Sequence, residues 1–225
     1  MFISCIDIGR HDDDAIRVMS SPYRTHAVIE AACSNSASAG EGRILWRVDP
    51  APSGLRLYLV SPSVPDMNEL SSRLSLPSES IRSKDYGTRL DSLRGGQAWA
   101  FRLKANPTRQ VRVDKGRSPN EKVIGSVQGH VTEAQQAQWL LDRSEAHGFR
   151  ICEDEFGNPE MAVSQRKKER FSRQDDKVTL VTCVFSGLLK IVDADAFRET
   201  LISGMGRAKG FGCGLLTIAS VQGRA

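Results

Sequence analysis

Tyr23 and His26 carry side chains that can catalyse the cleavage of a phosphodiester bond. They stand three residues apart at the start of a predicted short helix, so they share one face of it. Histidine exchanges a proton near neutral pH, tyrosine donates a hydrogen bond to an oxyanion, and the free N–H groups of a helix N-terminus favour a nearby phosphate. This set suits attack by an internal 2′-hydroxyl of RNA, which needs no metal. A lone helical histidine is more often structural, so the spacing alone does not establish this role.

A glycine-rich segment near the C-terminus is the second candidate. It interleaves Arg207 and Lys209 with the glycines at positions Gly204, Gly206, Gly210, Gly212 and Gly214. Glycine suits a backbone that approaches another chain closely, and arginine and lysine match phosphate charge. The segment is predicted to lie between a helix and a strand, the reverse of a dinucleotide-binding fingerprint, and it lacks the G-K-[ST] of a P-loop. A tight helix-to-strand connection is the alternative interpretation.

Basic side chains gather in two further segments of the second half. One set, Arg102, Lys104 and Arg109, lies on or after a predicted strand, and Arg112, Lys115 and Arg117 extend it. The other set, Arg166, Lys167, Lys168, Arg170 and Arg173, lies on a predicted hairpin. The formal net charge of the chain is +4, and the positive excess lies in this half. Such stripes suit the backbone of RNA, with a solvated charged surface as the alternative.

Composition excludes several classes of protein. With 225 residues and 40% hydrophobic side chains, the chain can build one large or two small cores. No run of 18 apolar residues occurs and the first residues lack the pattern of a secretory signal, which predicts a cytoplasmic protein without a membrane span. The five cysteines form no C-x-x-C pair, so neither a zinc site nor a disulfide framework is indicated.

The elements that must position these residues follow a repeated order. The first half reads as a strand over residues 2–8, a polar loop containing His11 to Asp14, and a helix with Ser21 as N-cap and Pro22 at its first position. Two alternating strands, RILWRVD and LRLYLVS, follow. Residues 62–97 are predicted to form loops with one short helix.

The second half opens with the strand AWAFRLKAN and continues with a helix that begins at a Thr132–Gln135 capping box and ends at Gly148. A long hairpin, a helix capped by Asp193 or Asp195 and a strand over GLLTIAS complete it. This βαββαβ order predicts an α+β protein of two tandem ferredoxin-like (RRM-like) domains, residues 1–97 and 98–225. The paired aromatic residues of an RNA-binding RRM sheet are not evident.

The sequence resembles the CasE type of CRISPR-associated endoribonucleases, which belong to type I-E Cascade systems. The segment SPYRTHAVI is similar to the Tyr-x-x-His stretch of that family, and GMGRAKGFGCGLLTIA is similar to its glycine-rich signature, with RILWRVD and FRLKANPTR in the expected order between them. The resemblance implies two ferredoxin-like domains, with Tyr23 and His26 as the catalytic pair facing the segment from Gly204 to Gly214. It implies that the hairpin around Arg166–Arg170 grips the RNA stem.

The same resemblance implies cleavage at the base of the hairpin of CRISPR repeat RNA, without a metal or a small-molecule cofactor. The products would be a 2′,3′-cyclic phosphate or 3′-phosphate end and a 5′-hydroxyl. The enzyme would keep the mature crRNA and join the other Cascade subunits. A catalytic lysine is not assigned, since Lys104, Lys168 and Lys209 all compete for that role.

Three other interpretations stay open at the level of sequence. A non-catalytic subunit that caps guide RNA needs the basic hairpin and glycine-rich segment but neither Tyr23 nor His26. A metal-dependent nuclease would use Asp12–Asp14, although adjacent carboxylates rarely converge on one ion. A nucleotide-binding enzyme is disfavoured because both glycine fingerprints fail.

Overall fold

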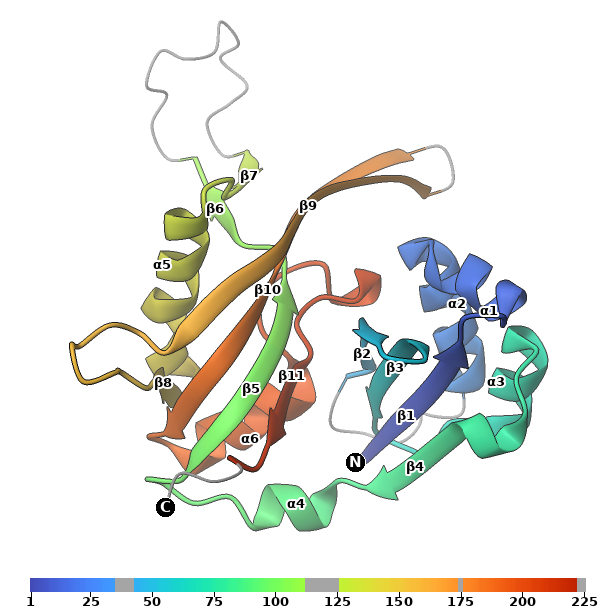
Figure 1. Cartoon of the computed structure of the whole chain (residues 1–225), viewed down its shortest axis with the longest axis horizontal. Helices are drawn as coiled ribbons and strands as arrows, with labels where there is room; N and C mark the ends of the chain where they lie inside the picture. The colour runs from blue at the N-terminus through green and yellow to red at the C-terminus, as the bar shows by residue number, and fades with distance from the viewer. Residues whose placement is uncertain (35–42, 112–125, 174–175, 222–225) are drawn as a thin grey trace, which may run out of the picture.

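Two antiparallel sheets, each with its own helices, lie side by side in the computed structural model of the protein (Figure 1). The structure describes residues 1–34, 43–111, 126–173 and 176–221. The predicted basic residues Arg112, Lys115 and Arg117 lie outside the described residues, and so does the side chain of Arg173.

The first sheet has the strand order β2-β3-β1-β4, and each neighbouring pair is antiparallel. Its strands are β1 (Phe2–Gly9), β2 (Leu45–Ala51), β3 (Gly54–Ser61) and β4 (Ile81–Asp85). The helices of this half are α1 (Asp13–Met19), α2 (Pro22–Ala32) and α3 (Met67–Leu74), followed by the short turn η2 (Ser78–Ser80). Apolar side chains of the sheet, including Ile6, Ile8, Leu57 and Leu59, pack with Ile29 and Leu70 of the helices in one buried cluster.

The second sheet has the order β11-β5-β10, with β8 and β9 both paired to β10. Its strands are β5 (Ala98–Ala105), β8 (Phe149–Ile151), β9 (Met161–Arg173), β10 (Asp176–Ile191) and β11 (Leu216–Ala219). The helical elements of the second half are α5 (Glu133–Ser144), η4 (Glu145–His147), α6 (Ala194–Ser203) and η5 (Lys209–Phe211). A small ribbon of β6 (Thr108–Gln110) and β7 (Val127–Gly129) stands apart from the sheet.

Both sheets place their first and third strands in the centre and their second and fourth strands at the edges, when β8 and β9 count as one interrupted strand. This is the arrangement of a ferredoxin-like βαββαβ unit, so the predicted tandem fold is confirmed. The predicted caps are also present. Ser21 accepts a hydrogen bond from Arg24 N, Thr132 and Gln135 form a capping box, and Asp193 rather than Asp195 caps α6.

Two predictions about the first half are wrong. Asp13 and Asp14 belong to the first turn of helix α1 rather than to a loop, with acidic side chains where the helix dipole favours them. Residues 62–97 contain strand β4 and the short helix α4 (Gly87–Asp91) in addition to α3. Strand β4 shows no alternation of apolar and polar residues because only its first residue, Ile81, is buried. The ribbon of β6 and β7 and the short strand β8 were likewise not predicted.

One buried arginine joins the two halves. Arg47 on β2 is only 1% exposed. Its Nε and Nη2 atoms donate to the Asp49 carboxylate at 2.8–3.0 Å. Its Nη1 donates across the interface to the carbonyl oxygens of Arg102 on β5 and Leu215, both at 2.9 Å, and Nη2 donates to the Thr217 hydroxyl on β11 at 2.8 Å. All five N–H groups of the guanidinium therefore have acceptors.

Apolar contacts continue the same interface. The hydrophobic core of the second half, built on Phe185, Phe197 and Leu201, also takes in five side chains from the first half. These are Leu45, Val60, Tyr86, Leu90 and Leu93. The two halves thus share buried area as well as the arginine network, which fixes their relative position.

No helix in the described ranges is long and apolar enough to cross a membrane.

We expect Arg47→Met to lower the free energy of unfolding by about 3–5 kcal/mol, because it leaves the buried Asp49 carboxylate without its bidentate partner. Arg102 gives limited compensation: its Nε lies 3.1 Å from Asp49 Oδ1, but the two atoms do not meet at a hydrogen-bonding angle. Urea denaturation measures the change. The control Arg73→Met removes an exposed pair with Glu69 on α3 and should cost less than about 1 kcal/mol. Equal small losses in both variants would contradict the role of Arg47.

Candidate active site

Helix α2 fixes one side of the candidate site. Its buried residues Thr25, Val28, Ile29 and Ala32 follow helical spacing and hold it against the first sheet. The Thr25 hydroxyl donates to Ser21 O, which secures the first turn. Tyr23 is 37% exposed and His26 is half-buried, so both candidates lie away from that packed face.

The glycine-rich segment approaches His26 directly. A Cβ atom built on Gly210 would lie 3.5 Å from both Cε1 and Nε2 of the imidazole, so the ring rests against the loop backbone. On its other side, the Nδ1 atom of His26 is 3.8 Å from Glu30 Oε1, an ion-pair distance when the ring is protonated. Nδ1 is buried and makes no hydrogen bond within the described structure. Residues from opposite ends of the chain thus meet at this imidazole.

Two glycines of this segment are required by close packing. A Cβ atom on Gly212 would lie 2.6 Å from Trp46 Cζ3 on β2, and one on Gly204 would lie 2.8 Å from Leu45 Cδ2. Both glycines also have positive φ, +75° and +67°. The segment can therefore reach the first half only because these positions lack a side chain.

Aromatic rings link the loop to the long hairpin of β9 and β10. Phe211 makes an edge contact with His26, with 6.5 Å between ring centroids. On its other side Phe211 meets Phe171 of β9 at 4.9 Å. The hairpin, the loop and the imidazole therefore form one continuous set of contacts.

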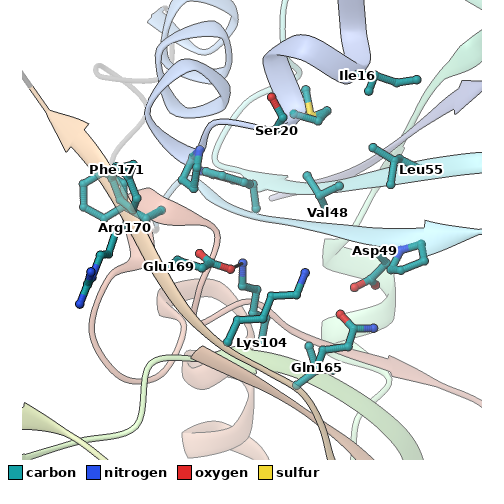
Figure 2. A pocket seen from close by; sticks show the side chains of 17 residues that line it. Ile16, Ser20, Val48, Asp49, Leu55, Lys104, Gln165, Glu169, Arg170 and Phe171 are labelled. Atoms are coloured by element: carbon teal, nitrogen blue, oxygen red, sulfur yellow. Dashed lines mark hydrogen bonds and ion pairs between the residues drawn. The ribbon is translucent and has the colours of Figure 1, made fainter. Parts of the chain in front are cut away.

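A groove of about 470 Å³ opens between the two halves beside these rings. Figure 2 shows Lys104 and Gln165 reaching into it from the second half, opposite Val48 and Asp49 on β2. Lys104 Nζ is 3.0 Å from Glu169 Oε1, so this lysine is paired within the protein. The guanidinium of Arg170 points away from Lys104 (Figure 2).

A β-bulge shapes the groove wall on β9. The pairing register with β10 shifts between Thr182 and Val184, and Gln165 has a φ of +48° at this point. After the bulge, Lys167, Glu169 and Phe171 alternate along β9 and line the groove. Bulges re-aim side chains in this way beside functional sites.

The predicted basic residues of β9 have different environments. Lys167, Lys168 and Arg170 are exposed, and none of them forms an ion pair within the described residues. Arg166 instead donates to Val131 O at 2.7 Å and lies 3.7 Å from Glu133 Oε2 on α5. All four side chains are exposed, but Arg166 has partners on and beside α5, while the other three form no ion pair within the described residues.

Other predicted residues lie apart from the imidazole. Arg102 faces the interface beside Asp49. Arg109, Gly206 and Arg207 line a separate cleft against α5. Lys209 is partly buried at η5, and burial, together with the nearby charge of Arg43, lowers the pKa of its ammonium group.

The carboxylates near the N-terminus are used by the local structure. Asp12 Oδ2 accepts from Gly9 N at 2.6 Å, and Asp14 pairs with Arg17 at 3.4 Å. In the part of the chain that the structure describes, no three His, Cys, Asp or Glu side chains gather as a metal site. No observation therefore favours the Asp12–Asp14 nuclease interpretation.

Several residues of the site were not predicted from sequence. They are Glu30, Arg47, Phe171, Phe211 and Glu169, each of which acts through a partner distant in sequence or on an adjacent helical turn. The alternation in RILWRVD predicts a polar, exposed strand face for Arg47 and Asp49, but both side chains are buried. The only sequence signal was the pair of opposite charges two residues apart.

The chain is similar to known proteins along nearly its whole length. The sequence model of a family described as CRISPR associated protein matches residues 1–220. The CRISPR-associated endoribonuclease Cse3 of Thermus thermophilus is 29% identical over 217 residues, or 91% of this chain and 93% of the relative. The CRISPR system Cascade subunit CasE of Escherichia coli is 32% identical over 120 residues, or 53% of this chain and 56% of the relative.

A solved structure extends this similarity to three dimensions. Thermus thermophilus Cse3 bound to an RNA representing a pre-cleavage complex matches with a TM-score of 0.76 at 26% identity, covering 97% of this chain and 98% of that chain.

We expect Gly212→Ala to destabilise the protein more than Gly96→Ala, by about 1–3 kcal/mol, because only the first forces a methyl group into the Trp46 ring. The control position has a similar φ of +86° but has no atom within 4 Å of the added Cβ, so it carries the backbone strain alone. Chemical denaturation of the two variants measures the difference. Equal stabilities would show that the loop does not depend on the contact with Trp46.

Proposed function

The chain belongs to the CRISPR-associated protein family, and from that membership we propose that it is an endoribonuclease that cuts CRISPR repeat RNA. Its relative Cse3 is named an endoribonuclease, and one structure of that protein holds an RNA representing a pre-cleavage complex. The observation in this chain that carries the proposal is the contact between His26 and Gly210. It places an imidazole on a glycine-rich, basic loop, beside a groove with lysines in its wall.

The proposed reaction uses no metal or cofactor. A ribose 2′-hydroxyl attacks the adjacent phosphorus, the bond from phosphorus to the 5′-oxygen breaks, and the products are a 2′,3′-cyclic phosphate and a 5′-hydroxyl. One proton leaves the 2′-hydroxyl and one reaches the 5′-oxygen, and His26 serves as the base or as the acid. Tyr23 orients the nucleophile or stabilises developing charge. Lys209 and the loop amides hold the phosphate at this site. Arg207, expected from its place in the glycine-rich segment to join them, lines the separate cleft against α5 instead.

Recognition of the RNA stem falls to the long hairpin. Lys167, Lys168 and Arg170 are exposed and have no carboxylate partner among the described residues, so their charges are available to RNA phosphates. Phe171 connects this strand to Phe211 and hence to His26. A stem held on the hairpin would therefore lie beside the imidazole.

The partners follow from the same relatives. The Escherichia coli relative is named a Cascade subunit, and we infer that this chain keeps its mature crRNA and assembles with the other subunits of such a complex in the cytoplasm. We also place the boundary between its two domains at residues 97 and 98. The first sheet ends with β4 at Asp85 and the second begins with β5 at Ala98, which supports that division.

The proposed chemistry is tested with the host's own CRISPR repeat hairpin, labelled and incubated with the protein in EDTA. We expect cleavage of the all-ribose RNA and none of a copy with 2′-deoxyribose at the cut site, because the nucleophile is then absent. Products are resolved on a denaturing gel. Loss of cleavage in EDTA would reject the metal-free mechanism. Tight binding without cleavage of either RNA would favour the non-catalytic subunit that caps guide RNA.

We expect His26→Ala to slow cleavage by about 10²–10⁴-fold while leaving repeat RNA bound, because it removes one proton-transfer group. Single-turnover rates and fluorescence anisotropy measure the two effects. The matched control is His11→Ala, at an exposed histidine outside the site, which should cleave at the parent rate. An equal loss of binding and rate at His26 would reject its catalytic assignment.

A substrate with sulfur in place of the leaving 5′-oxygen separates the two roles of His26. A thiolate leaves without a general acid, so His26→Ala would cut this RNA near the parent rate if His26 is the acid. The variant would stay slow if His26 is the base.

A further inference from the structure

A second cleft, of about 450 Å³, lies where α5, the β6–β7 ribbon and the glycine-rich loop meet. Three arginines from three different elements line it: Arg109 of β6, Arg143 of α5 and Arg207 of the loop. None of the described residues lining the cleft is acidic. Its lining also differs completely from that of the groove containing Lys104.

The floor of this cleft holds Arg143 in place. Its guanidinium lies over the ring of Trp139, 4.9 Å from the centroid, and its Nη1 donates to Trp139 O at 3.1 Å. Trp139 is 3% exposed and stacks on Phe185 in the core. The planar group of Arg143 is therefore preorganised, which reduces the entropy lost when it binds an anion.

The glycine-rich loop brings the third arginine to the same floor. Gly206 has a φ of +80°, and a Cβ atom there would lie 3.1 Å from the Trp139 ring. Glycine therefore lets the backbone lie against the ring, and Arg207 follows it at the rim. Gly210, four residues after Gly206, lies beside His26, and four residues span at most about 14 Å. One loop thus links the cleft to the candidate active site.

The arginines of the cleft have no carboxylate partner within the described ranges. Among the residues that the structure describes, none of the three arginines pairs with a carboxylate, whereas Arg17, Arg56, Arg73, Arg150 and Arg198 all do. The neighbouring His130 responds to this field. Its pKa is lowered first by burial and then by the charges of Arg109 and Arg143.

We propose that this cleft binds the phosphate backbone of single-stranded RNA adjoining the repeat hairpin, as a second RNA contact separate from the groove between the two halves. The proposal rests on the proposed function for its source of RNA. A cavity of this size accommodates about one or two nucleotides but not a duplex. One arginine guanidinium can donate two parallel hydrogen bonds to the oxygens of a phosphate. The face of Trp139 is already covered by Arg143, so a base cannot stack on it. The cleft therefore recognises phosphate rather than base.

The test compares the parent protein with the variant Arg109→Gln/Arg143→Gln/Arg207→Gln. The control Arg17→Gln/Arg73→Gln/Arg150→Gln has the same net charge but removes arginines that pair with carboxylates elsewhere. Three RNAs are used in fluorescence anisotropy at several KCl concentrations: the trimmed repeat hairpin, the hairpin with single-stranded extensions, and an oligouridylate. Each hairpin carries 2′-deoxyribose at the cut site so that it stays intact.

We expect an extension to tighten binding to the parent and to the control, and the cleft variant to lose that gain. The slope of log K against log[KCl] for the extended RNA should become shallower by about 2, since each phosphate contact on a single strand contributes about 0.7. The double variant Arg109→Gln/Arg207→Gln leaves the packed Arg143 in place and should shift the slope by about 1.4, which guards against misfolding of the triple variant.

Four outcomes would overturn the proposal. In the first, a single-stranded extension does not raise the affinity of the parent protein for the hairpin. In the second, the cleft variant loses as much affinity for the trimmed hairpin as for the extended one. In the third, the salt slope of the cleft variant equals that of the control. In the fourth, inorganic phosphate displaces the extension at concentrations near the affinity of phosphate for the cleft, which would identify a free anion as the occupant.

The oligouridylate separates this proposal from the proposed function. Its binding should depend on the three arginines whether or not the protein cuts the repeat. If the protein cuts the repeat but its oligouridylate binding does not depend on the three arginines, the proposal for the cleft is rejected and the nuclease function stands. If oligouridylate binding depends on the arginines but the repeat is not cut, the nuclease function is rejected and the proposal for the cleft stands.

Discussion

The buried Arg47 guanidinium ties the two halves together, because its N–H groups donate to acceptors in both of them. A charged group removed from water is tolerated only when its donors are satisfied, and here the acceptors come from Asp49 on its own strand and from two strands of the other half. The plane of the guanidinium also faces the ring of Tyr58 at 5.3 Å. Because the acceptors include the carbonyl of Leu215, just beyond the glycine-rich segment, the position of that segment relative to α2 is set by this network.

The glycine-rich segment depends on this fixed position for its contacts with the rest of the protein. Its missing side chains allow contacts with three elements: β2 through Gly212, α2 through Gly210 and α5 through Gly206. Its charged members occupy different surroundings, with Arg207 at the rim of the arginine cleft and Lys209 partly buried. An added Cβ would lie 2.6 Å from the Trp46 ring at Gly212 and 3.1 Å from the Trp139 ring at Gly206, so ordinary side chains at these two positions would push the loop away from β2 and α5.

The described arginines and lysines discussed above fall into two groups: those with partners inside the protein and those without a carboxylate partner. Arginines and lysines at the interface and in the groove wall, such as Arg47 and Lys104, have carboxylate or carbonyl partners. In the described parts of the chain, Lys167, Lys168 and Arg170 of the β9–β10 hairpin and the three arginines of the cleft have no carboxylate partner. RNA phosphates would complete the second group without disturbing the first, because no internal ion pair has to break.

Periodicity, capping signals and glycine content are local properties of the chain, so the sequence predicts the ferredoxin-like order of elements, the caps at Ser21 and Thr132 and the long hairpin. The same local signals nominate Tyr23 and His26 as catalytic candidates. The sequence did not reveal strand β4, whose pairing with β1 rather than its own pattern makes it a strand. Three further features are visible in the folded chain alone: Gly210 lies beside His26, Arg47 is buried, and Arg109, Arg143 and Arg207 share one cleft. The physical reason is that burial and charge pairing depend on partners distant in sequence, and a residue's type does not specify which partner it will meet.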